Sequence, residues 1–158
     1  MKKAILLPLI LGVTTFAMAS TSNCRGCASG KLMLQCDYYV VKQGDMTKRS
    51  TCEEYAGIVD VDGASAKAAW YYLLAGNVDK ALDAAERAIG IGHAFANEYA
   101  AYALLIQGKE REAAAAMKCF REAVHEKSFV KRDIETLKKF YPSIDFSKLD
   151  IRVDEIHQ

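Results

Sequence analysis

Three short stretches of this chain repeat one pattern at a fixed distance, and this repeat constrains the fold more than any other feature. The stretches YYVVKQGDM, WYYLLAGNV and YALLIQGKE begin at Tyr38, Trp70 and Tyr102. When the stretches are aligned, Gly44, Gly76 and Gly108 fall 32 residues apart each time. A catalytic site is normally present once in a chain. A pattern that occurs three times therefore predicts architecture and binding.

The residues around each glycine have the periodicity of two helices. In the middle copy, apolar residues recur at helical spacing before Gly76 and again after it, from Ala81 to Ala88. The glycine predicts the end of the first helix, and Asp45 or Asn77 is a suitable cap for the second. A period of this length is typical of a solenoid, in which each helix pair buries its apolar face against its neighbours.

The glycine alignment also pairs residues within the first helix of each unit. Val41, Leu73 and Leu105 share one position, and small Ala69 and Ala101 share another, where the first copy has Asp37. The alanine-rich second helices, KALDAAERAI and EREAAAAMKCF, predict close approach of backbones together with high helix propensity.

The middle copy, YYLLAGNVDKALDAAERAI, resembles the tetratricopeptide repeat (TPR) in its paired aromatics, its glycine turn and its spaced alanines. The repeat of 32 residues differs from the 34 of that family, and Ala85 stands where a large aromatic is usual. The resemblance covers residues 31–126. It implies an all-α fold, a short α-solenoid of about three TPR-like helix pairs, with a concave face that holds a peptide or a protein partner.

Segments of different character flank the repeats. Residues 1–19 carry two lysines, an apolar core and the A-x-A sequence at Ala17 to Ala19, as a cleaved signal peptide does. Residues 20–30 form a cysteine-containing N-terminal segment. Residues 127–158 predict a capping helix, stopped by Pro142, and a C-terminal arm that either docks or is loose. The mature chain is therefore expected in the periplasm or outside the cell, without stable membrane insertion.

Five cysteines in an exported chain predict disulfides. Cys36 and Cys52 lie eight residues before and after Gly44. On two antiparallel helices both would stand roughly 12 Å from the turn and would face each other. A bond there closes a loop of 15 residues and can contribute about 3 kcal/mol.

The remaining cysteines leave alternatives open. Cys24 and Cys27 have C-x-x-C spacing, which fits a structural disulfide, a metal site or a redox pair. Redox enzymes place this pair after a strand, and no strand is predicted here. Cys119 lies in an alanine-rich helix, where we expect a buried thiol.

Nothing else in the sequence predicts catalysis. The three histidines are isolated, and no nucleophile elbow, phosphate loop or dinucleotide motif is present. We therefore expect no enzyme, no cofactor and no metal. Without Lys2 and Lys3 the formal charge of +1 becomes −1, which does not favour nucleic acid as a partner.

The leading functional hypothesis is an interaction module that binds a protein or peptide, as an adaptor, an assembly factor or an immunity-type inhibitor. Tyr and Trp are common anchors of interfaces, so the predicted binding residues are Tyr39, Tyr71, Trp70 and Tyr102, with Tyr39 and Tyr71 the expected exposed pair. The alternative is a thiol-active or metal-binding protein that uses Cys24 and Cys27.

Overall fold

The computed structural model describes residues 25–61, 63–125 and 128–149, and these ranges fold into helices without any β-strand. In chain order the elements are α1 (Arg25–Gln35), the π-helix η1 (Cys36–Lys42), η2 (Met46–Lys48), α2 (Arg49–Val61), α3 (Ser65–Ala75), α4 (Val78–Gly90), α5 (Ala96–Ile106), α6 (Glu110–Ala123), α7 (Ser128–Phe140) and η3 (Phe146–Leu149). The all-α class predicted from the sequence is confirmed. No helix in the described part of the chain is long and apolar enough to cross a bilayer.

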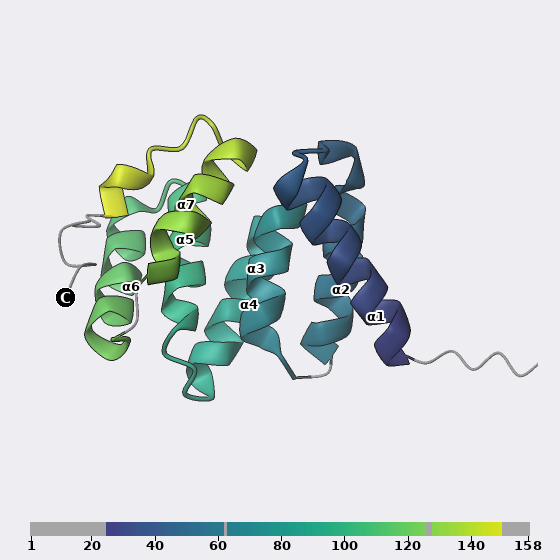
Figure 1. Cartoon of the computed structure of the whole chain (residues 1–158). Helices are drawn as coiled ribbons and strands as arrows, with labels where there is room; N and C mark the ends of the chain where they lie inside the picture. Colours follow the sequence, from purple (N-terminus) through teal and green to yellow (C-terminus); the bar gives the residue numbers. More distant parts are fainter. Residues whose placement is uncertain (1–24, 62, 126–127, 150–158) are drawn as a thin grey trace, which may run out of the picture.

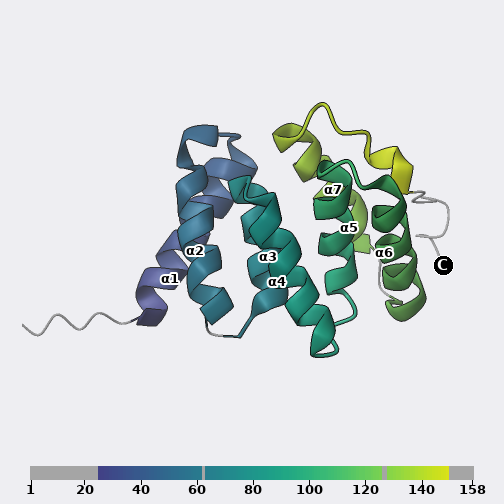
Figure 2. The ribbon, with the colours of Figure 1, turned by 180° about the vertical axis from the view of Figure 1, so that it is seen from behind.

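The helices pack in the order in which they occur along the chain. The continuous helix formed by α1 and η1 lies against α2, and α2, α3, α4, α5 and α6 each contact the next (Figure 1). The view from behind shows the same succession, with α4 between α2 and α6 (Figure 2). Each predicted helix pair is thus present, and each pair packs on its neighbour.

The repeated glycines form the turn inside each pair. Gly44, Gly76 and Gly108 have φ angles of 72°, 85° and 79°, a left-handed conformation that glycine adopts without steric cost. The Asp45 carboxylate accepts a hydrogen bond from the Thr47 amide at 3.0 Å. The predicted glycine turns and the cap at Asp45 are confirmed, and Asn77 caps α4 in the same way.

The π-helix η1 corrects the alignment of the first copy by one residue. Its hydrogen bonds, such as Gln43 N–H to Tyr38 O at 3.1 Å, span five residues, so the segment holds one residue more than an α-helix would. Val40 is fully buried there, whereas Val41 is only partly buried. Val40 therefore occupies the position of Leu73, and the predicted pairing with Val41 is wrong.

The same shift changes the small position of the first helix. Cys36, and not Asp37, is completely buried, as Ala69 and Ala101 are. The small side chain of Cys36 therefore replaces the alanine that lets the other helix pairs approach closely. Asp37 is turned out of that contact, toward α3.

The end of α7 is fastened to the ends of α2 and α3. The Tyr141 hydroxyl donates a hydrogen bond of 2.6 Å to the Leu73 carbonyl oxygen. Arg49 Nε donates one of 2.9 Å to the Leu74 carbonyl oxygen, and its guanidinium lies 5.2 Å from the centre of the Phe140 ring. One side chain at the start of α2 thus joins the carboxyl ends of α3 and α7.

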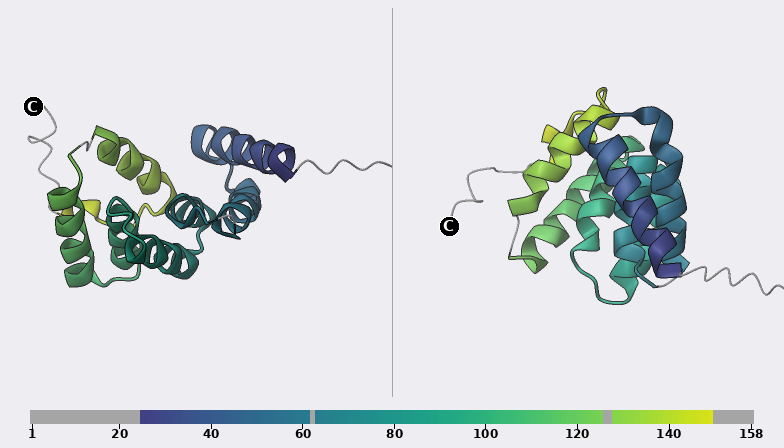
Figure 3. Two further views of the ribbon diagram at one scale, coloured as in Figure 1. Left: turned by 90° about the horizontal axis from the view of Figure 1, so that it is seen from below. Right: turned by 45° about the vertical axis from the view of Figure 1, so that its right-hand side comes forward.

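The helix α7 occupies the segment for which the sequence predicted a capping helix, and the described part of the C-terminal arm docks as the short helix η3. Phe146 and Leu149 of η3 are buried, and η3 contacts α5 and α6. Seen from below, α1 and α7 stand on the same side of α3 and α5, and α4 lies on the opposite side (Figure 3).

Candidate functional site

The surface between η1 and α7 is the candidate site, and we call it the inner face. Lys67, Trp70, Tyr71 and Leu74 lie on one stripe of α3, because they follow the spacing i, i+3, i+4, i+7. In α5, Phe95 lies directly before the helix, and Tyr99 and Tyr102 continue the same spacing. Seen from below, α1 with η1 and α7 stand on the same side of α3 and α5, the two helices that these stripes follow (Figure 3).

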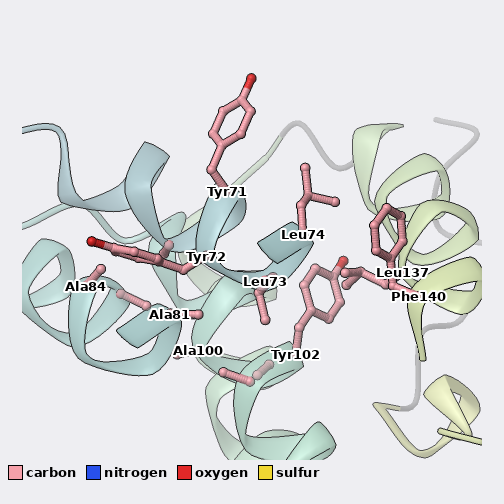
Figure 4. Packing of buried hydrophobic residues seen from close by; sticks show 14 of the residues in the cluster. Tyr71, Tyr72, Leu73, Leu74, Ala81, Ala84, Ala100, Tyr102, Leu137 and Phe140 are labelled. Carbon is pink, nitrogen blue, oxygen red and sulfur yellow. The ribbon is translucent and has the colours of Figure 1, made fainter. Parts of the chain in front are cut away.

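Tyr71 is on the inner face but is not exposed, which contradicts the prediction. Its side chain points away from Leu73 and Tyr102 (Figure 4), yet only 6% of it is accessible. The hydroxyl donates a hydrogen bond of 3.0 Å to Asp37, and the ring packs edge-on against Tyr55 with centroids 4.6 Å apart. The shift in η1 causes this burial, because it turns Asp37 toward α3.

The Tyr71–Asp37 contact is a polar one inside a largely apolar setting. Burial raises the pKa of the Asp37 carboxyl, although the Tyr71 hydroxyl and the nearby Lys67 oppose the shift. Burial and the Asp37 charge also raise the pKa of Tyr71, so its hydroxyl remains a donor. The contact therefore ties η1 to α3.

The other predicted binding residues divide between surface and core. Tyr39 is 39% exposed, as expected, and it touches the exposed ring of Tyr38. Tyr102 is completely buried, and its ring packs against Phe146 of η3. Tyr102 therefore cannot line an open binding face in this structure. That part of the prediction fails because α7 and η3 cover α5.

Trp70 belongs to a row of four rings, which we call the aromatic cluster: Trp70, His93, Phe95 and Tyr99. The Trp70 and Tyr99 rings lie 5.9 Å apart, Tyr99 and Phe95 lie 6.4 Å apart, and Phe95 stacks on His93 at 5.7 Å. His93 is exposed and Phe95 is 40% exposed, whereas Trp70 and Tyr99 are partly buried. The cluster is thus an aromatic surface supported from beneath by two helices.

The sequence prediction found Trp70 and missed the other three members. His93 and Phe95 lie between α4 and α5, outside the repeated stretches on which the prediction relied. The stretch GIGHAF contains the signal, because loops between regular elements often carry binding residues and this one holds a histidine and a phenylalanine. Periodicity alone does not find such residues.

Two carboxyl groups are buried where α7 meets α5. Glu98 is completely buried, and Asp133 of α7 is 5% exposed. Burial raises the pKa of Glu98 to about 8, against the hydrogen bond from the Tyr102 hydroxyl, and burial also raises the pKa of Asp133. Desolvation and the Glu98 charge raise the pKa of Tyr99. This corner of the inner face is therefore polar and water-poor.

The cysteines follow the prediction in part. Cys36 and Cys52 form a disulfide with their Cα atoms 5.0 Å apart, so that prediction is confirmed. Cys24 lies outside the described residues, and Cys27 lies in α1 without a described side chain, so their pairing stays a prediction. Cys119 is a free thiol on the exposed side of α6, and the prediction of a buried thiol is wrong. Met117 and Phe120 take the buried side of that helix.

A second concave region lies between α2 and α4, with a cavity of about 390 Å³. It is lined by Asp60, Val61, Tyr72, Lys80, Asp83 and Arg87. Its charges are already paired, since Arg87 bonds both Asp60 and Asp83 and Lys80 bonds Glu53 at 2.9 Å. No group of three or more metal-ligating side chains occurs in the part of the chain that the structure describes.

Comparison with known proteins adds no relative. No protein-family model, no curated protein and no solved structure matches this chain.

Proposed function

We propose that this protein is an interaction module of an exported compartment that binds a protein or peptide partner through the aromatic cluster on its inner face. The observation that carries the proposal is the row of four touching rings, two of them exposed and two held by α3 and α5. Rigid aromatic side chains bury a large area on binding and lose little conformational freedom. An adaptor, an assembly factor and an immunity-type inhibitor all act in this way.

We also propose that the helix pairs are divergent TPR-like repeats. The left-handed glycines at a constant spacing and the buried alanines of the first helices support this relationship. The bonded Cys36–Cys52 pair is compatible with the oxidising compartment that residues 1–19 predict. In repeats of this kind the first helices line the binding face, which fits a site on α3 and α5.

The proposal is tested with Phe95→Ala in a capture experiment from periplasmic extract. We expect the variant to lose a stoichiometric partner that the parent retains, because the Phe95 ring lies directly before α5 and is 40% exposed. Ile91→Ala is the matched control, since Ile91 is 66% exposed in the same loop and has no ring contact in the cluster. Both variants should keep the parent's melting temperature.

The comparison between the two variants decides the result. Loss of the partner in Phe95→Ala alone supports the aromatic cluster as the site. Equal capture by parent, Phe95→Ala and Trp70→Ala would refute it, and loss in Ile91→Ala as well would mean that the loop, and not the cluster, makes the contact.

A thiol function of Cys24 and Cys27 is the second candidate. Because Cys36 and Cys52 are bonded to each other, Cys24 and Cys27 are left to pair with each other or with Cys119. A measured reduction potential separates the two roles. A structural Cys24–Cys27 bond resists reduction by glutathione, whereas a catalytic one is reduced readily.

A further inference from the structure

Glu98 is the one fully buried ionisable carboxyl in the described part of the chain, and its environment is incomplete. The Tyr102 hydroxyl donates a hydrogen bond of 2.5 Å to Oε1. The second oxygen, Oε2, is buried and has no hydrogen-bond partner. An unpaired carboxylate oxygen in such a place is costly, and a protonated carboxyl group costs less because it carries no charge.

The groups that face Glu98 do not neutralise it. On α7, Asp133 is buried and adds a second negative charge, and Arg132 binds Asp133 through Nε at 3.2 Å. The Arg132 side chain is 77% exposed, so solvent screens its attraction. On α5, Tyr99 and Tyr102 are neutral neighbours, and from η3 the apolar ring of Phe146 packs on Tyr102.

We propose that α7 is a proton-controlled latch over the inner face: it docks on α5 while Glu98 holds a proton, and ionisation of Glu98 releases it. Glu98 on α5 and Asp133 on α7 are both buried and interact electrostatically, so ionisation of both places like charges in a water-poor layer. Release hydrates both groups. It also uncovers the side of the Tyr102 ring that lies beside Leu137 and Phe140 (Figure 4).

The direction of the pH effect follows from the shift of Glu98. With α7 docked, burial raises the pKa of Glu98 from the ordinary 4.5 to about 8, and the Asp133 charge adds to the rise. A released state that hydrates Glu98 binds the proton less tightly. The released fraction therefore rises with pH between about 4.5 and 8, by up to about tenfold per pH unit, and levels off above that range. The raised pKa of Asp133 adds to the change at the acidic end.

Hydrogen exchange measured by mass spectrometry between pH 5 and 9 tests the latch. We expect the protection factors of α7 amides, corrected for the intrinsic exchange rate, to fall at least tenfold between pH 6 and 8. The amides of α4 should keep theirs, because a local release leaves the rest of the fold intact. A constant protection of α7 across this range would overturn the proposal, as would an equal fall in α4.

Matched variants separate ionisation of Glu98 from other effects of pH. Glu98→Gln keeps an acceptor for Tyr102 and cannot ionise. In this variant the ratio of the α7 protection factors at pH 6 to those at pH 8 should be at least tenfold smaller than in the parent. Glu135→Gln, on the exposed side of α7, should behave as the parent does. If α7 protection falls as much in Glu98→Gln as in the parent, the proposal is refuted.

Tyr102→Phe provides a second route if the glutamine variant folds poorly. It removes the hydroxyl whose hydrogen bond lowers the pKa of Glu98. The pH range of release should therefore move upward in this variant. An unmoved or lowered range would contradict the proposal.

Discussion

Gly76 and Gly108 have the same backbone conformation and different surroundings, which makes them a matched pair. Both have a positive φ, but a Cβ added at Gly108 meets nothing within 4 Å. A Cβ at Gly76 would lie 3.2 Å from the guanidinium carbon of Arg49. That guanidinium is held in place by the Leu74 carbonyl and the Phe140 ring, so it has little freedom to move away.

Alanine at the two glycines should therefore have unequal effects on stability. Gly108→Ala should lower the free energy of unfolding by about 1–2 kcal/mol, the usual strain of a left-handed residue that has a Cβ. Gly76→Ala should cost more, because the added methyl group also displaces Arg49. Urea denaturation of both variants measures the difference. Equal losses would show that Arg49 adapts freely and does not fasten the three helix ends.

At the scale of single elements, the sequence predicted the helix hairpins well and the first helix imperfectly. Glycine is almost obligatory where φ is positive, so the three turns were readable from composition and spacing. The π-helical turn in η1 has no comparable residue signature, and it moved every side chain before it by one position. Asp37 and Tyr71 consequently met, and a surface prediction for Tyr71 became a buried contact.

The candidate site was predictable only where it overlaps the repeats. Trp70 lies in a repeated stretch, whereas Phe95 and His93 lie in the connection between two pairs. Glu98 was not predicted, because a glutamate in a helix is ordinarily solvated, whereas here the side chain is completely buried and interacts with Asp133 of α7. Burial of a side chain by helices distant in the sequence is a tertiary effect, and a local sequence pattern does not reveal it.

The disulfide is the element-scale feature with the clearest effect on stability. It joins η1 to α2 across a loop of 15 residues, so removing it should cost about 3 kcal/mol, largely by freeing the unfolded chain. The double variant Cys36→Ser, Cys52→Ser should remain helical and show a lower urea midpoint. Cys119→Ser, which changes an exposed thiol, should leave the midpoint unchanged. If the two variants unfold at the same midpoint, the bond contributes nothing to this helix pair.

At the scale of the whole molecule, α7 and η3 pack across the helix pairs: α7 contacts α3, and η3 contacts α5 and α6. Their buried apolar side chains are Val130, Ile134, Leu137, Phe140, Phe146 and Leu149. These residues join the same core cluster as α3 and α5, so the last part of the chain is continuous with the core.

Removal of α7 and η3 should leave the inner face permanently uncovered, as release of α7 does. A chain ending at Val124 should stay helical, melt at a lower temperature than a chain ending at Leu149, and bind the dye ANS at pH 6, because Tyr102 and the α5 stripe lose their cover. The longer chain should bind the dye only as the pH approaches 8, when Glu98 ionises. Circular dichroism and dye fluorescence on the same samples measure both effects. If the two chains melt together and neither binds the dye at pH 6, α7 does not cover the inner face in solution.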